Sequence, residues 1–262
     1  MFGRDRLALG FSGAWPRLLG AMAIVVIGGV LAGPWPGRAQ ESEPTQASDV
    51  FKIARGGQLY DKWWAVTEHD EPTDTQPSYP TAGKQQGAAT WRCVECHGWD
   101  YKGVDGVYGS GEHFTGIKGV RGVVGMDVDK LHAILMNKTH GYSEHQMTHS
   151  AMDKLALFLS LGQIDMDQYI DRVTKKARGS VESGARFFQT VCAICHGFDG
   201  KMMNFGNDEQ PEYLGTIAND SPWELLHKIR NGQPGMPMPA LGALTPQEQV
   251  DILAYVQTLP EK

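Results

Sequence analysis

The pattern of apolar and polar positions in the last third of the chain predicts two helices with well-marked ends. A capping box at 221–224, with proline at the first helical position, precedes an apolar face that stops at Asn-Gly, 231–232. A second capping box at 245–248 begins a final helix that reaches Leu259. The first of these helices carries Leu225, Leu226 and Ile229 on one face.

The same order of elements occurs earlier in the chain. Asp127 caps a helix that ends at Asn137, and another helix runs from about 150 to 162. Each half also begins with a helix, one from Phe51 and a shorter one at 184–188. Neither half shows the two-residue alternation of strands, so we predict an all-α fold that arises from internal duplication of a small helical unit.

Changes in composition predict the domain boundaries. Arginines, an apolar run and a small-x-small cleavage pattern indicate an N-terminal signal peptide. When Gly57 is matched to Gly184, the first half contains an inserted loop at 70–90 that is rich in Pro, Thr, Gln and Gly. The predicted boundaries are 1–39 for the signal peptide, 40–50 for a disordered lead-in, 51–163 for the first domain, 164–178 for a charged, partly helical linker, and 179–262 for the second domain.

Two copies of one five-residue motif contain all four cysteines of the chain. The first runs from Cys93 to His97 and the second, 99 positions later, from Cys192 to His196. C-x-x-C-H is the signal for covalent haem c, in which the thiols add to porphyrin vinyl groups and the adjacent imidazole binds the iron. We therefore predict two haem c groups, attached through Cys93, Cys96, Cys192 and Cys195, with His97 and His196 as proximal iron ligands.

Two other interpretations of the cysteines are weaker. A C-x-x-C pair can be a redox disulfide, and two such pairs can form one zinc site. Both leave unexplained why each pair is followed directly by a histidine.

Each half resembles a class I c-type cytochrome domain, with a helix leading into C-x-x-C-H, a loop, a middle helix, a distal ligand loop and a C-terminal helix. Over about 51–262 the chain is similar to tandem dihaem cytochromes of that class. The resemblance implies that both axial positions of each iron are filled. It also implies haem attachment outside the bacterial cytoplasm, which agrees with export to the periplasm by a cleavable signal peptide.

The resemblance further implies a methionine as the sixth ligand in the second half, where the distal loop contains two Met-Pro pairs. Met238 is favoured because it leaves a short step to the last helix, and Met236 is the alternative. A thioether ligand raises the reduction potential of haem iron.

The first half has no Met-Pro pair. His140 follows His97 by 43 residues, close to the 42 residues that separate the proposed ligands of the second half, so bis-histidine ligation is our first choice. Met147 is the second candidate and His145 the third, and an open five-coordinate iron is the remaining alternative.

Other residues have simpler interpretations. His132 and His227, on the middle helices, are interpreted as surface or capping residues. The tryptophans near the first motif are interpreted as core and haem packing.

The net charge of −6 excludes most nucleic-acid partners and suits docking to a basic patch on a redox protein. We expect a periplasmic dehydrogenase or reductase on one side and a terminal acceptor on the other. A membrane would be a partner only if the signal segment is not cleaved.

These features favour a dihaem electron carrier, either free or as a subunit of a dehydrogenase or reductase complex. The alternative is a redox enzyme that acts at an atypically ligated first haem. Thiosulfate dehydrogenases of this kind use a cysteine thiolate, and this chain has no fifth cysteine. A dihaem peroxidase would need a longer chain. A gas sensor is the third hypothesis, but no signalling domain accompanies the motifs.

Overall fold

The computed structural model describes residues 48–262, in which helices are joined by turns and irregular loops. These residues contain two isolated β-bridges and no strand, which confirms the all-α prediction. The predicted signal peptide, 1–39, lies outside the described residues. None of the described helices combines the length and apolar character needed to span a membrane.

The α-helices are α1 (Asp49–Thr67), α2 (Cys93–His97), α3 (Val128–Leu135), α4 (His149–Leu157), α5 (Val181–Phe187), α6 (Ala193–His196), α7 (Leu214–Asp220), α8 (Pro222–Asn231) and α9 (Pro246–Val256). Short 3₁₀ turns lie at Gly87–Trp91, Arg121–Val123 and Met166–Gln168, and π-turns extend α4 over Phe158–Gly162 and α5 over Phe188–Cys192.

Of the two predicted capping boxes, the one at α9 is present and the one at α8 is not. Helix α9 begins with the predicted capping box, in which Thr245 and Glu248 exchange hydrogen bonds. At α8 the predicted capping box is wrong, because the Ser221 side chain makes no capping hydrogen bond. The unpredicted helix α7 ends at this point, and the Ser221 N–H donates to the carbonyl of Ile217 at 2.8 Å. Ser221 therefore joins two helices.

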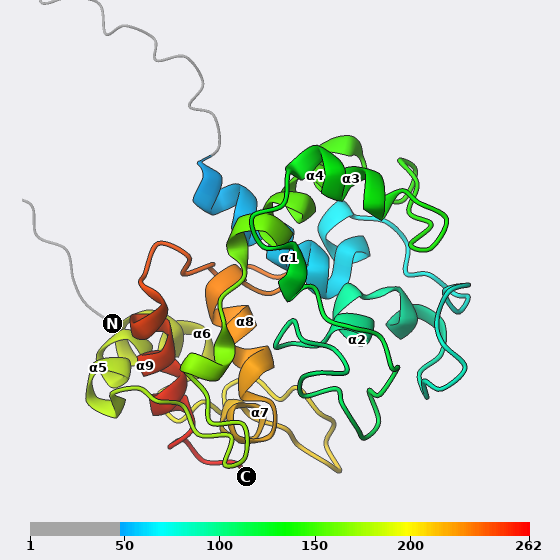
Figure 1. The fold of residues 1–262 in the computed structure, drawn as a ribbon. Helices are drawn as coiled ribbons and strands as arrows, with labels where there is room; N and C mark the ends of the chain where they lie inside the picture. The colour runs from blue at the N-terminus through cyan, green and yellow to red at the C-terminus, as the bar shows by residue number, and fades with distance from the viewer. Residues whose placement is uncertain (1–47) are drawn as a thin grey trace, which may run out of the picture. The chain divides into compact units, whose positions relative to one another are not determined.

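One glycine in each half allows the first helix to cross the last helix closely. A Cβ at Gly184 of α5 would lie 1.8 Å from the carbonyl oxygen of Asp251 in α9, and a Cβ at Gly56 of α1 would lie 2.0 Å from that of Lys154 in α4. Figure 1 shows α1 beside α4 and α5 beside α9. Gly57 instead faces the Asn231 side chain of α8, so Gly56, rather than Gly57, is the structural counterpart of Gly184.

The described residues form one compact unit with a continuous hydrophobic core. Met166 and Ile170, in the predicted linker, are fully buried in this core. The linker therefore packs against the helices instead of running exposed between them. The division into two domains stays a prediction.

We expect Gly184→Ala to destabilise the haem-loaded protein by about 1–3 kcal/mol, because the new methyl group overlaps the backbone of α9. The sign is diagnostic, since replacing glycine by alanine inside a helix is otherwise favourable. Chemical denaturation measures the change. Gly122→Ala, at an exposed position with nothing within 4 Å of the new Cβ, is the matched control. Equal stability of the two variants would contradict the close crossing.

Candidate functional site

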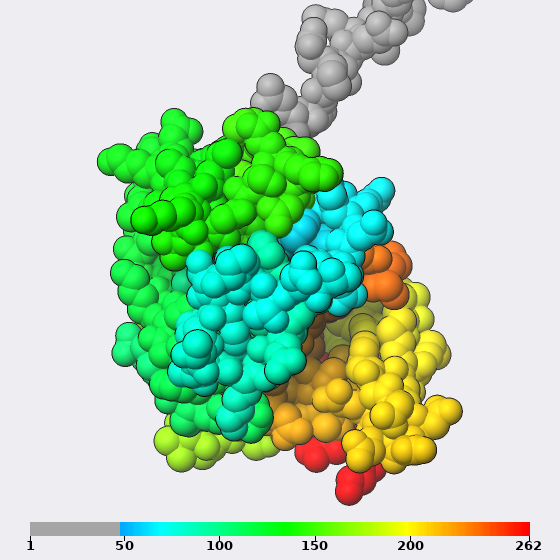
Figure 2. Space-filling model, turned by 90° about the vertical axis from the view of Figure 1, so that its right-hand side faces the viewer, coloured from blue at the N-terminus to red at the C-terminus, as the bar shows by residue number. Residues whose placement is uncertain are grey.

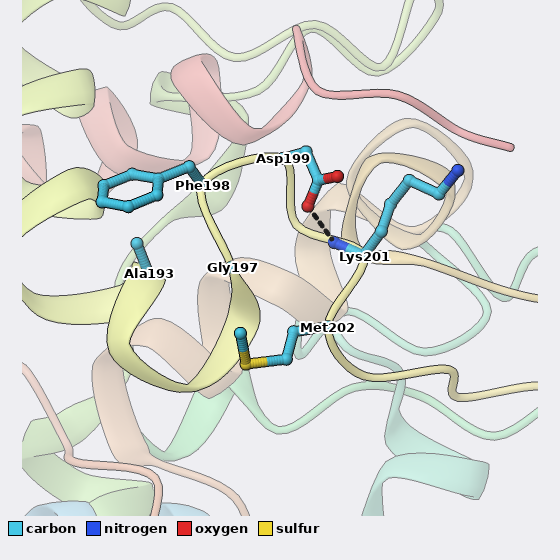
Figure 3. A pocket seen from close by; sticks show the side chains of 6 residues that line it. All are labelled: Ala193, Gly197, Phe198, Asp199, Lys201 and Met202. Atoms are coloured by element: carbon cyan, nitrogen blue, oxygen red, sulfur yellow. Dashed lines mark hydrogen bonds between the residues drawn. The ribbon is translucent and has the colours of Figure 1, made fainter.

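Both C-x-x-C-H motifs continue into the same backbone turn. Each is followed by a glycine with positive φ, +77° at Gly98 and +75° at Gly197. The aspartate two residues later accepts a hydrogen bond from the backbone N–H two residues beyond it, at 3.1 Å for Asp100 and 3.0 Å for Asp199 (Figure 3 shows the second). The N–H six residues after each histidine donates to that histidine's carbonyl, at 2.8 and 3.0 Å. The two motifs are therefore alike in the backbone turn that follows them as well as in sequence.

None of the four motif cysteines is joined to another in a disulfide. Cys93, Cys96 and Cys192 are partly buried and Cys195 is exposed. Each pair keeps the two-residue spacing on which attachment of a haem through two thioether bonds depends.

The structure brings the rings of His97 and His140 together in the first half, with centroids 6.4 Å apart and ring planes tilted by 33°. The Nδ1 atom of His97 lies 2.7 Å from the carbonyl oxygen of Lys118, and that of His140 lies 3.0 Å from the carbonyl of Ile134. A carbonyl only accepts, so each Nδ1 carries the hydrogen and each Nε2 keeps its lone pair. Two imidazoles that bind one metal ion from opposite sides through bonds of about 2 Å have centroids about 6 Å apart.

Both rings are neutral at physiological pH. Burial lowers the pKa of His97 to about 4, against a partly compensating hydrogen bond to the Lys118 carbonyl, and burial also lowers the pKa of His140. A neutral imidazole with its second nitrogen fixed by a backbone acceptor is the form that binds a metal ion. The pair therefore fits an iron centre with two axial histidines.

The inserted loop supports the segment that carries His140. The Gln76 side chain donates to the carbonyl of His140 at 2.9 Å, and the Gln76 backbone N–H donates to Thr90 at 2.9 Å. The Tyr142 hydroxyl donates to the carbonyl of Trp91, two residues before Cys93, at 2.7 Å. The distal segment is thus tied both to the insertion and to the start of the first motif, a role that the composition of the loop did not indicate.

The other two candidates of the first half lie in different surroundings. Met147 is fully buried in the hydrophobic core. The ring of His145, which is exposed, lies 6.1 Å from that of His69. Among the histidine candidates, His140 is the one whose ring faces His97.

The proximal histidine of the second half has a different environment. The Nδ1 atom of His196 is buried and has no hydrogen-bond partner among the described residues, and burial lowers the pKa of this histidine. Large apolar side chains around it are exposed, with Ile194 at 76%, Phe198 at 72% and Met202 at 66%. A pocket of about 540 Å³ lies beside the motif, lined in part by Phe198 and Met202 (Figure 3). This combination fits a site for a large apolar group.

The Met-Pro loop of the second half is anchored to α1. The Gln58 side chain donates to the carbonyl of Asn231 at 2.8 Å, and Gly232, at φ +82°, lets the chain pass close to the Met238 carbonyl. Met236 is 59% exposed, whereas Met238 is half-buried. Figure 2 shows the surface hollowed where the orange segment around this loop meets the yellow segment after the second motif and the cyan segment of the first half.

A buried ion cluster joins the two halves. Asp61 of α1 accepts hydrogen bonds from Arg92, the residue before the first motif, and from Nζ of Lys228 in α8, the latter at 2.8 Å. Both cations also lie over the Trp99 ring, 5.6 and 5.2 Å from its centroid. Burial alone would raise the pKa of Asp61, but the charges of Lys228 and Arg92 outweigh it and hold that pKa below its usual value.

His227 completes this junction, and its interpretation as a surface or capping residue is wrong. The side chain is fully buried. Its Nδ1 accepts from the Tyr101 hydroxyl at 2.8 Å, and its Nε2–H donates to the carbonyl of Gly57 at 2.9 Å. One side chain on α8 therefore satisfies groups from α1 and from the turn after the first motif. The apolar pattern of α8 carries no signal for this, because both partners are far away in the sequence.

Comparisons with known proteins agree with these features. Residues 179–256 match the family model of cytochrome c oxidase, cbb3-type, subunit III. A cytochrome c-553-like protein of Synechocystis sp. is 32% identical over 98 residues, which make up 37% of this chain and 84% of that relative. The chain belongs to the c-type cytochromes. This cytochrome accordingly binds haem c and transfers electrons. The first C-x-x-C-H motif lies outside residues 179–256.

We expect acid to destabilise this cytochrome partly through His227, whose pKa is lowered by burial to about 4 from an ordinary value of 6.5. The unfolded state binds this proton more readily, so stability is lost as the pH falls from about 6.5 toward 4. His227→Gln keeps hydrogen-bonding capacity without titrating, and should reduce that loss by up to about 3 kcal/mol in denaturation curves.

His113→Gln is the control for this experiment. The hydrogen bond to Glu95 raises the pKa of His113, so its contribution is present at low pH and is lost as the pH rises. Removing it should not flatten the acid decline. An identical decline in wild type and His227→Gln would contradict the assignment.

Proposed function

We propose that this cytochrome is an exported, periplasmic dihaem carrier that passes electrons between a redox enzyme and an acceptor, either free or as the electron-transfer subunit of a dehydrogenase or reductase complex. The observation that supports it most strongly is the repetition of the turn after both C-x-x-C-H motifs, down to the positive-φ glycine and the aspartate that closes the turn. Cys93, Cys96, Cys192 and Cys195 would hold two haem c groups.

Haem c, when bound, supplies the one-electron couple of its iron. In the first half, His97 and His140 would hold the iron through their Nε2 atoms, because the Lys118 and Ile134 carbonyls occupy the Nδ1 side of each ring. In the second half, His196 and Met238 would fill the two axial positions, with Met236 as the alternative to Met238. With these side chains on the iron, water and substrate would be kept from it, which favours a carrier over an enzyme.

The surroundings of the two proximal histidines support a difference in potential. The Nδ1–H of His97 is bonded to a carbonyl, and such a bond makes an imidazole a stronger donor that favours the oxidised metal. The Nδ1 of His196 has no such partner among residues 48–262, and a thioether on the opposite side favours the reduced metal. Electrons would therefore enter through the first half and leave through the second.

Charge and the predicted leader support the choice of partners. The net charge of −6 favours transient docking to basic patches, and electron-transfer contacts typically bury less than about 1,200 Å² in total. Residues 1–39 carry the pattern of a cleavable signal peptide. A membrane would be involved only if that segment is retained.

Carbon monoxide tests the filled axial positions. We expect both irons of the wild type to be low-spin and indifferent to carbon monoxide in absorption spectra. His140→Ala should open one iron, so that half of the haem binds the gas. His145→Ala, three positions before the next helix cap and on the same segment, is the matched control and should behave as wild type.

The second half has its own matched pair, in which Met238→Ala should open the other iron and Met236→Ala should not. Wild-type protein that binds carbon monoxide would reject the carrier and favour the enzyme or the gas sensor. Binding by His145→Ala and not by His140→Ala would reject the ligand assignment alone.

Redox titration tests the order of the potentials. We expect two midpoint potentials, of which the lower belongs to the first half. His140→Met should raise the lower midpoint, because a thioether replaces an imidazole, and should leave the upper one in place. If Met238→His shifts the lower midpoint instead of lowering the upper one, the proposed direction of electron flow is wrong.

A further inference from the structure

A second pair of histidines lies between α3 and α4, apart from the residues that would hold haem. The Nδ1 atom of His132, in α3, is 2.7 Å from Oδ1 of Asp153. The Nε2 atom of His149, the first residue of α4, is 2.8 Å from Oε1 of Glu144. The two remaining ring nitrogens, Nε2 of His132 and Nδ1 of His149, face each other at 3.0 Å. The four side chains form a chain of carboxylate, imidazole, imidazole and carboxylate.

The hydrogens on the ring nitrogens of these four side chains leave room for a cation between the two imidazoles. An ionised carboxylate only accepts hydrogen bonds, so the outer nitrogen of each ring carries a hydrogen. The inner nitrogens of two neutral rings then present lone pairs to each other. Two lone pairs at 3.0 Å repel, and the repulsion is relieved by a proton on the line between the nitrogens or by a metal ion beside that line, which both lone pairs can reach.

We propose that His132 and His149 bind a first-row divalent transition-metal ion such as Cu²⁺ or Zn²⁺ through these two inner nitrogens. The ring centroids are 5.0 Å apart, and two imidazoles on one tetrahedral ion with bonds of about 2 Å have centroids about 5 Å apart. Asp153 and Glu144 act on the outer nitrogens, as carboxylates do behind metal-binding histidines.

Water completes the coordination of the ion. Within residues 48–262 no three or more His, Cys, Asp or Glu side chains converge on one point, so the two imidazoles are the protein ligands. His149 is 59% exposed and His132 14% exposed, which leaves a path from solvent. The N-terminus of α4 disfavours a cation, but the two carboxylates offset it with two negative charges. Imidazole ligands bind Cu²⁺ more tightly than Zn²⁺.

The ion would connect α3 and α4 on either side of the segment 136–148, which contains His140. Binding to the folded state alone raises the melting temperature, so thermal stability is a second readout besides affinity. The site does not depend on the proposed electron-carrier function.

Isothermal titration of metal-free, haem-loaded protein with Cu²⁺, and separately with Zn²⁺, tests the site. We expect one saturable site that binds Cu²⁺ more tightly, and a rise in Tm on loading. His149→Ala should lose at least tenfold in affinity together with the Tm shift. Asp153→Asn, which leaves both imidazoles in place, should lose about tenfold.

His145→Ala is the matched control, because His145 is also exposed and lies beside another histidine, His69. It should retain the affinity of the wild type. Absence of a saturable site, unchanged affinity in His149→Ala, or an equal loss in His145→Ala would each overturn the proposal. An unchanged haem spectrum in every variant verifies that the protein compared is folded.

Discussion

The fixing of imidazole rings by backbone carbonyls is the constraint on which the first site depends. His97 and His140 come from segments 43 residues apart, and the Nδ1–H of each ring donates to a backbone carbonyl that fixes the direction of its Nε2 atom. The carbonyl of Lys118 belongs to the loop after the first motif and that of Ile134 to the end of α3, so both rings are oriented by backbone that is itself part of the fold. The inserted loop then holds the His140 segment through Gln76. The inserted loop, which the second half lacks, therefore helps to position His140, the proposed ligand in which the two halves differ.

The junction between the halves carries a second set of constraints. Asp61, with its two cations, and His227, with its two hydrogen bonds, are buried, so each group must be satisfied across the junction. Arg92 directly precedes the first motif, and Lys228 lies in the helix that leads to the Met-Pro loop of the second half. The same side chains thus fix the start of one motif relative to the distal loop of the other, and would keep the two proposed haem groups at a constant separation.

Much of the local structure could be predicted from the sequence because its signals are local. The caps at Asp127 and Thr245, the scarcity of strands and the paired motifs depend on residues within a few positions of one another. The features that the sequence did not predict depend on distant partners. Helix α7 has no clear apolar pattern, and Ser221 caps nothing because a helix already ends there. The burial of His227 and the counterpart role of Gly56 follow from helix crossings that no short pattern encodes.

The candidate site likewise combines residues that local patterns predict with contacts to distant residues that they do not. The Cys and His residues of both motifs are evident from spacing, whereas the orientation of His140 depends on Ile134 and Gln76, which the motif does not include.

The central claim is that both halves carry a covalently bound haem, and the mass of the intact, denatured polypeptide tests it most directly. The account predicts a mass above that of the mature chain by two haem groups, and by one when Cys93 and Cys96 are both replaced by alanine. A single haem on the wild-type chain would contradict it.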